Sequence, residues 1–130
     1  MPILKPIDEN KAKGKVKQVF DNIKKERKIK VIPNFWKTIA NDPETLERTW
    51  NSLKETMKKG ALDSVTKEMI YIAVSITNSC EYCIRSHTAA AKKRGMSEKM
   101  LKELIAVVGM ANETNKLVEA YQVEVDDFLK

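Results

Sequence analysis

Apolar residues recur at helical spacing along most of this chain, and no other pattern limits its fold as strongly. Three stretches repeat large apolar residues every three or four positions, which places each set on one face of a helix. These sets are Val16, Val19, Phe20 and Ile23; Leu46, Trp50, Leu53 and Met57; and Val65, Met69, Ile72, Ala73 and Ile76. No segment alternates apolar and polar residues as a half-buried strand does. The sequence therefore predicts an all-α fold of about six to seven helices.

Capping and breaking residues predict where the first helices begin and end. The expected boundaries are Gly14 near the start of the first helix, Pro33 in the first turn of the second, Asp42 as the cap of the third with Gly60 as its stop, and Asp63 or Ser64 at the start of a fourth that runs to about Thr77. Trp36, Trp50 and the methionines then belong to the core.

The second half should hold three further helices. Asn78 or Ser79 offers a cap for a helix that starts at Cys80 and runs to Arg94, with Gly95 closing it. The remaining two helices are expected over residues 97–110 and 115–128.

The size and composition fit one soluble domain spanning residues 1–130. The chain has 42% hydrophobic and 32% charged residues, which suits a globular protein with a core of ordinary size. It has no long apolar run and no N-terminal signal pattern. We therefore expect a cytoplasmic protein with no membrane partner.

The net charge of +6 comes entirely from the first half of the chain. Residues 1–59 carry fifteen lysines and arginines against eight acidic residues, whereas residues 60–130 carry nine against ten. Clustered basic residues attract phosphate, but here they are scattered around an amphipathic segment with no nucleic-acid-binding motif. A solvated helix face explains them, and no nucleic-acid partner is expected.

The only two cysteines and the only histidine lie within eight residues, at Cys80, Cys83 and His87. On a helix this spacing brings both thiols and the imidazole to one face. The two cysteines can form a disulfide, and the imidazole can take a proton from a thiol to give the reactive thiolate. The cluster therefore indicates redox or nucleophilic thiol chemistry.

Three other interpretations stay open. Cysteine is often a small buried apolar residue, and Cys-x-x-Cys can bind zinc. A closed zinc site usually needs four ligands, so Cys80, Cys83 and His87 would require a carboxylate to complete it. A permanent structural disulfide would close a very short loop and constrain the unfolded chain little.

An all-α chain also changes what the motif means, because thioredoxin-like proteins place Cys-x-x-Cys after a strand. Here the cysteines should lie in the first turn of a helix, where unpaired backbone N–H groups and the helix dipole favour a thiolate. The helix dipole alone favours Cys80 as the more acidic thiol.

Glu68, followed by Cys80, Cys83 and His87, resembles the E-x11-C-x2-C-x3-H signature of the alkylhydroperoxidase D-like group in the carboxymuconolactone decarboxylase family. The similarity covers about residues 30–112. It includes the segments Val31-Ile32-Pro33-Asn34-Phe35-Trp36, Asn41-Asp42-Pro43-Glu44, Thr66-Lys67-Glu68-Met69-Ile70 and His87-Thr88-Ala89-Ala90-Ala91.

The resemblance implies that Glu68 faces the cysteine helix and forms a proton relay with His87. From its position alone, Glu68 would be a solvated carboxylate near a helix start. By the same resemblance Cys83 meets a peroxide and Cys80 resolves the sulfenic acid to a disulfide. Some family members carry a second histidine where this chain has Tyr82, which cannot act as a base near neutral pH.

The activity implied is that of a thiol-dependent peroxidase or disulfide reductase. Such an enzyme reduces a small hydroperoxide, and a dithiol or protein reductant then reduces its disulfide back to two thiols. No metal, flavin or haem is expected, and the resemblance implies a homo-oligomer, a trimer or hexamer. Two alternatives remain: a decarboxylase or isomerase of a small carboxylated lactone, and a non-catalytic metal-binding or redox-sensing module.

Overall fold

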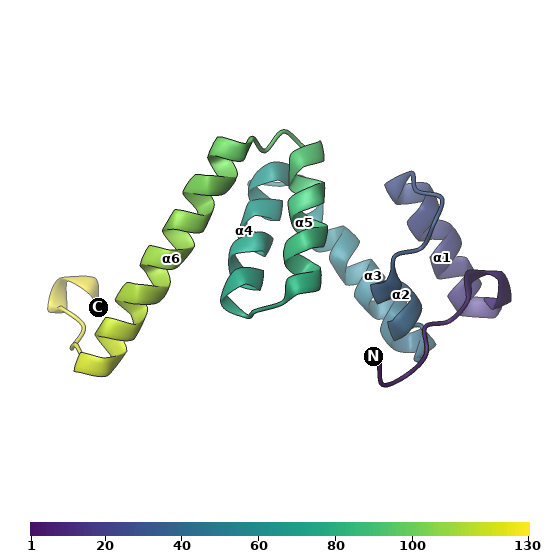
Figure 1. Ribbon diagram of the computed structural model, residues 1–130, viewed down its shortest axis with the longest axis horizontal. Coiled ribbons are helices and arrows are strands. Elements are labelled where there is room, and N and C mark those ends of the chain that lie inside the picture. Colours follow the sequence, from purple (N-terminus) through teal and green to yellow (C-terminus); the bar gives the residue numbers. More distant parts are fainter. The chain divides into compact units, whose positions relative to one another are not determined.

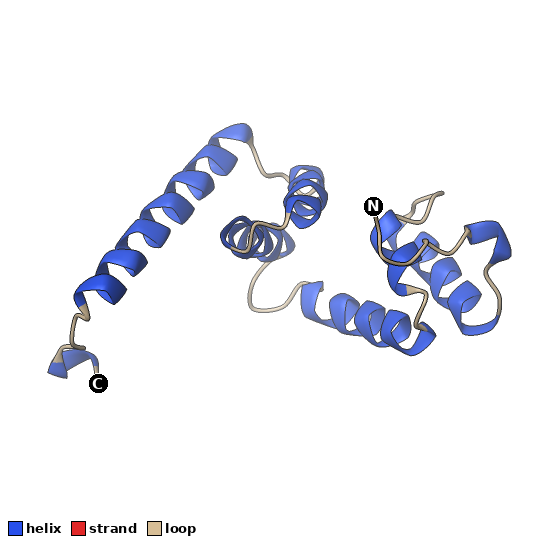
Figure 2. Cartoon of the chain, turned by 60° about the horizontal axis from the view of Figure 1, so that its bottom comes forward, coloured by secondary structure: helices blue, strands red, loops and turns tan.

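The computed structural model describes all residues from Met1 to Lys130, and every regular element is helical (Figures 1 and 2). The elements are η1 (Glu9–Lys11), α1 (Gly14–Arg27), α2 (Asn34–Ile39), α3 (Pro43–Met57), α4 (Ser64–Thr77), α5 (Glu81–Lys93), α6 (Glu98–Tyr121) and η2 (Asp127–Leu129). The predicted all-α fold, with six α-helices, is confirmed. The chain divides into two units, Met1–Lys58 and Lys59–Lys130. The assignment of one domain to residues 1–130 stays a prediction.

The first unit packs α1, α2 and α3 around a core that joins residues of the first two apolar stripes to three from α2 and its flanks. The buried members are Val16, Val19, Phe20, Ile23, Ile32, Trp36, Ala40, Leu46 and Trp50. The rings of Trp36 and Trp50 meet edge to face at 5.4 Å, and the indole N–H of Trp50 donates a 2.7 Å hydrogen bond to Asn22. Both tryptophans are thus core residues, as predicted.

The capping residues of this unit follow the sequence closely. The carboxylate of Asp42 accepts hydrogen bonds from the backbone N–H groups of Glu44 and Thr45, and Pro43 occupies the first turn of α3. One expectation was wrong by a residue: Pro33 precedes α2 as its N-cap and does not lie in its first turn. Its ψ of 148° is extended, so the helical conformation begins only at Asn34.

The second unit consists of a hairpin of α4 and α5, with α6 packed against α4 (Figure 1). Its buried apolar core is Ile72, Ala91, Met96, Leu104 and Val108. Asp63 caps α4 through the N–H of Thr66, as predicted. Ala91 is fully buried, and such a small side chain allows α5 to lie close to its neighbour.

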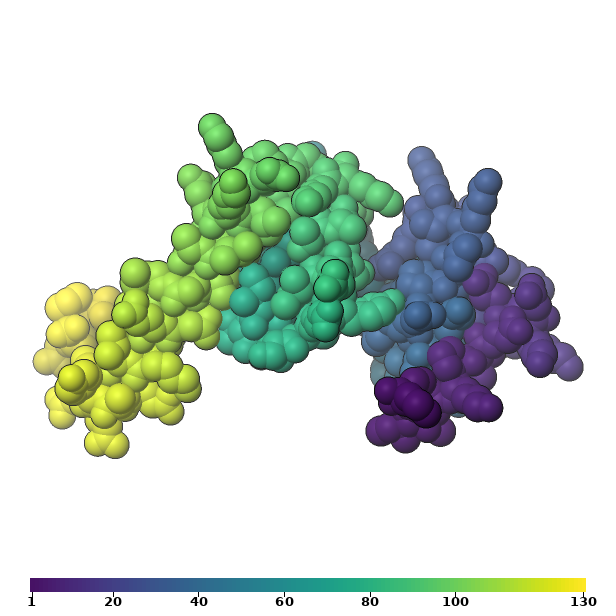
Figure 3. All heavy atoms as spheres, in the orientation of Figure 1, coloured from purple at the N-terminus to yellow at the C-terminus, as the bar shows by residue number.

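The two helices predicted over residues 97–110 and 115–128 are wrong, because α6 runs without interruption from Glu98 to Tyr121. Residues 111–114 contain no proline or glycine, and Asn112 and Thr114 bond back to helix carbonyls with their side chains. The polar side chains of Asn112 and Thr114 therefore do not interrupt the helix. Every residue from 113 to 130 is exposed, and the space-filling view shows this end of the chain in yellow (Figure 3).

None of the helices combines the length and the apolar character that crossing a lipid bilayer requires.

Candidate active site

Cys80 lies at the junction of α4 and α5 and belongs to the end of one helix and the start of the next. Its backbone N–H donates a 3.0 Å hydrogen bond to the carbonyl of Ser75 in the last turn of α4. Its sulfur accepts a 3.3 Å hydrogen bond from the backbone N–H of Cys83, which makes Cys80 the N-cap of α5. The predicted caps, Asn78 and Ser79, were wrong. Two helices therefore fix the position of this one residue.

Ser79 makes that junction possible through an unusual backbone. Its φ of 56° is in the left-handed region, which glycine occupies most readily. With Ser79 in this conformation, the Cys80 N–H can reach back to Ser75, which is the bond pattern of a Schellman helix end. The chain then turns sharply enough for α5 to begin at once.

Cys83 lies in the first turn of α5, and both cysteines are free thiols and half-buried. The hydrogen bond with Cys80, burial and the negative charge of a Cys80 thiolate raise the pKa of Cys83 to about 11, opposed by its backbone hydrogen bond. The two sulfurs cannot both ionise near neutral pH. The Cys80 sulfur accepts a hydrogen bond from a backbone N–H at the start of α5, where the helix dipole favours negative charge.

The Nδ1 atom of His87 lies 2.6 Å from Oε2 of Glu68, which joins α5 to α4. The two side chains are 13% and 7% exposed, so a buried carboxylate orients a nearly buried imidazole. Glu68 therefore faces the cysteine helix, as the family resemblance implied, and is not the solvated acid that its position alone suggested. An imidazole held in this way can accept and return a proton.

Two residues that sequence reasoning missed complete the surroundings of this pair. Nη1 of Arg94 lies 3.8 Å from Oε1 of Glu68, and the ring of Tyr71 stacks on His87 with centroids 3.6 Å apart. Tyr71 follows Glu68 by three positions, and Arg94 follows His87 by seven, so helical spacing from the two predicted residues could have identified both.

The sequence profile of the Carboxymuconolactone decarboxylase family matches residues 43–124, which include the whole site. The chain belongs to this family. The resemblance identified from the Glu-Cys-Cys-His signature is therefore confirmed.

Individual proteins also resemble the chain. The crystal structure of the alkylhydroperoxidase AhpD core of Rhodospirillum rubrum is 46% identical, with a TM-score of 0.94, and the match covers 100% of this chain and 98% of that one. An alkyl hydroperoxide reductase of Mycobacterium tuberculosis is 23% identical over 86% of this chain. An (R)-2-haloacid dehalogenase of Pseudomonas putida is 27% identical over 84%. The chain spans only about a third of those two curated relatives, 32% and 36% of their lengths.

Tyr82 marks the departure from the family members with a second histidine. Its side chain is 45% exposed, whereas Cys83 beside it is half-buried against the hairpin. This family member therefore has one imidazole at its dithiol, that of His87.

The site shows no arrangement suited to a metal ion, because no three histidine, cysteine or acidic side chains of the chain gather as a ligand set. Zinc binding by Cys80, Cys83, His87 and a carboxylate gains no support from this geometry.

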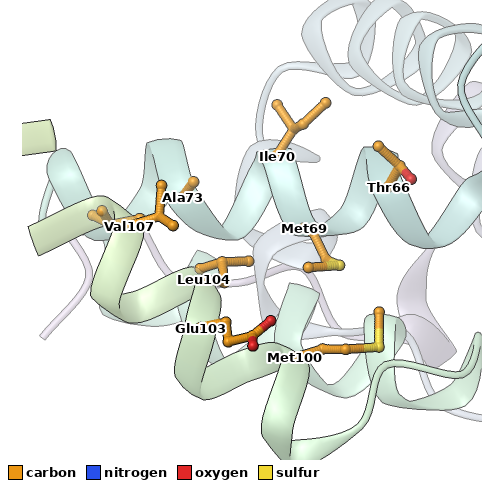
Figure 4. Close-up of a pocket in the computed structure, with 9 residues that line it drawn as sticks. Thr66, Met69, Ile70, Ala73, Met100, Glu103, Leu104 and Val107 are labelled. Carbon is orange, nitrogen blue, oxygen red and sulfur yellow. The ribbon is translucent and has the colours of Figure 1, made fainter. Parts of the chain in front are cut away.

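An apolar groove of about 500 Å³ lies on another face of α4, between α4 and α6 (Figure 4). It is lined by Thr66, Met69, Ile70, Ala73, Met100, Glu103, Leu104, Val107 and Val108. None of the four predicted site residues contributes to this groove.

Proposed function

We propose that this chain is a thiol-dependent peroxidase or disulfide reductase that cycles between the Cys80/Cys83 dithiol and a disulfide. The observation that carries the proposal is the position of the Glu68–His87 pair on the same helical hairpin as two free thiols, one of which caps the helix. The relatives named for alkyl hydroperoxide reduction support it at the level of the family.

In the first step a Cys80 thiolate attacks one peroxide oxygen of a hydroperoxide. An S–O bond forms and the O–O bond breaks, so the sulfur is oxidised to a sulfenic acid, and the departing alkoxide takes up the proton that the Cys80 thiol lost on ionising and becomes an alcohol. The backbone N–H of Cys83, in the first turn of α5, donates a hydrogen bond to the Cys80 sulfur and stabilises its negative charge before attack. This order reverses the one implied by family resemblance, in which Cys83 attacks.

In the second step Cys83 closes the disulfide. Once the Cys80 sulfur is oxidised, neither its thiolate hydrogen bond nor its negative charge raises the pKa of Cys83, and only burial still does. His87, one helical turn from Cys83, accepts the thiol proton while Glu68 stabilises the resulting imidazolium. Cys83 then attacks the sulfenic sulfur and releases hydroxide, which takes the proton as water. A dithiol or protein reductant restores both thiols by exchange.

A thiol count after addition of stoichiometric hydroperoxide tests this function. We expect two titratable thiols before the addition and none after it, with an intact mass lower by two hydrogens. Two free thiols and no peroxide consumption above a protein-free control would contradict it. In that case turnover of a small carboxylated lactone, a reaction class to which the family name also points, becomes the leading alternative.

We also propose that the chain works as a homo-oligomer, a trimer or hexamer, with α6 in the contact. Ile70 and Val107 line the groove and are 49% and 67% exposed, and Ile105 and Met110 of α6 are exposed by similar fractions. A second copy of the chain would cover this apolar surface. Sedimentation equilibrium should give a mass of three or six chains, and a monomer at micromolar concentration would refute the proposal.

A further inference from the structure

The face of the His87 ring is covered by the ring of Tyr71. The centroids lie 3.6 Å apart and the planes are inclined by 21°, so the two rings are stacked. Tyr71 and Glu68 are three positions apart on α4 and therefore share the side of that helix that meets α5. His87 is thus held by Glu68 at an edge nitrogen and by Tyr71 on a ring face.

The chemistry of that contact depends on the charge of both rings. An aromatic face carries partial negative charge and attracts a cation placed over it, with a strength that grows as water is excluded. Neutral imidazole gains little from this attraction, whereas protonated imidazole gains more. The contact with Tyr71 is therefore stronger while His87 carries a proton that it has taken from a thiol.

Tyr71 also stays uncharged in this environment. Burial and the negative charges of Cys83, Cys80 and Glu68 raise the pKa of its phenol above the usual value. Tyr71 therefore adds no negative charge of its own when a thiol ionises. Tyr71 therefore acts on His87 through the face of its uncharged phenol ring.

We propose that Tyr71 is a positioning residue of the dithiol site, whose ring face holds His87 in line with Glu68 and stabilises the imidazolium that forms when His87 takes a thiol proton. The effect on thiol reactivity rests on the proposed function, whereas the effect on the protonation of His87 does not. Specificity for the aromatic face follows, so Tyr71→Phe should preserve the role and an aliphatic residue should abolish it.

The groups that face His87 come from both helices of the hairpin. Glu68 and Tyr71 contact His87 from α4. Cys83 precedes His87 by one helical turn on α5, and Arg94, the C-cap of α5, lies 3.8 Å from Oε1 of Glu68. Ionisation of a nearby thiol changes the electrostatic field at the imidazole as the pH rises. The titration is therefore best followed with both cysteines replaced by serine.

His87 is the only histidine, so its imidazole C–H signals identify themselves in a proton NMR spectrum of the full chain. We expect Tyr71→Leu to lower the pH midpoint of these signals by roughly 0.5 to 1 pH unit. Tyr71→Phe should leave the midpoint within about 0.2 unit of the parent. The control is Tyr121→Leu, which removes a 79% exposed ring at the far end of α6 and should change nothing.

With Cys83 restored and Cys80 kept as serine, Tyr71→Leu should slow iodoacetamide alkylation of Cys83 at neutral pH by about 3- to 10-fold, while Tyr71→Phe alkylates at the rate of the same background. An unchanged His87 midpoint in folded Tyr71→Leu overturns the proposal, as does a Tyr71→Phe that behaves like Tyr71→Leu. If Tyr71→Leu does not fold, Tyr71→Met is judged by the same criteria. The parent protein must in addition show a nuclear Overhauser effect between the two rings, and its absence also overturns the proposal.

These outcomes separate the role of Tyr71 from the peroxidase function. A shifted midpoint in a protein that consumes no peroxide would leave Tyr71 as the partner of His87 and refute the proposed activity. Peroxide consumption with an unshifted midpoint would do the reverse.

Discussion

Glu68 and His87 form a 2.6 Å contact between two helices of a single hairpin, and both side chains are almost excluded from solvent. A carboxylate at this distance orients the imidazole and offsets the positive charge that the ring gains when it accepts a proton. The ability of the site to accept a thiol proton therefore depends on both Glu68 and His87.

Removing either member of the pair should slow thiol ionisation. In a Cys80→Ser background, where Cys83 is the only thiol, we expect Glu68→Gln and His87→Ala to reduce alkylation of Cys83 near neutral pH by roughly 10²- to 10⁴-fold, the range for loss of a general base. Circular dichroism should show that both variants remain helical. Glu81→Gln is the matched control, because it makes the same chemical change in the first turn of α5 at a side chain that is 79% exposed. Parental rates in both variants would mean that the pair only packs the hairpin.

Single cysteine variants should separate the two thiols. Cys83→Ser keeps the capped Cys80 sulfur and should react once with peroxide, then stop at a sulfenic acid that a dimedone-type reagent traps. Cys80→Ser should lose most of this first reaction. Trapping in Cys80→Ser alone would instead assign the attack to Cys83, in agreement with the family resemblance and against the capping geometry.

The raised pKa of Cys83 should make stability depend on pH in the alkaline range. Its value is about 11 in the folded chain against an ordinary 9.0, so the unfolded chain releases this proton first. The contribution to the free energy of unfolding is complete below pH 9 and is lost as the pH rises to about 11. Thermal melts of reduced protein should show a steeper alkaline decline for the parent than for Cys83→Ser. Parallel curves from pH 8 to 11 would contradict this.

The backbone of Ser79 makes glycine the better residue there. Because its φ is 56°, we expect Ser79→Gly to raise the free energy of unfolding by about 0.5 to 1 kcal/mol. The same substitution at exposed Ser86, inside α5, should lower it by about 0.5 kcal/mol. Urea denaturation of both variants measures the difference, and a loss of stability in Ser79→Gly would show that its side chain is needed at the junction.

The helices and their buried faces could be predicted because each apolar stripe follows one helical period, and Asp42 and Asp63 are strong caps. The last helix could not be delimited in this way. Asn112 and Thr114 resemble loop residues in sequence, but their side chains bond to carbonyls of the same helix.

The sequence indicated a cluster of Cys80, Cys83 and His87, but it did not indicate the geometry around them. Glu68 interrupts no apolar period, so burial of its carboxylate becomes clear only when α5 supplies His87 as a partner. Cys80 is not a usual capping residue, and its role depends on the left-handed Ser79 before it. Nothing in the sequence around Tyr71 sets it apart from other residues of the helix, and its role becomes visible only when the His87 ring is seen stacked on it.

All four predicted site residues, with Tyr71 and Arg94, come from one stretch of 27 consecutive positions, Glu68 to Arg94. The contact that matters most joins residues only 19 positions apart. Because the chain between Glu68 and His87 is short, bringing them together costs little conformational entropy, and the contact can form before distant parts of the chain have folded. The hairpin thus contains all of these residues, so a larger protein could include it as a unit while the rest of its sequence differs.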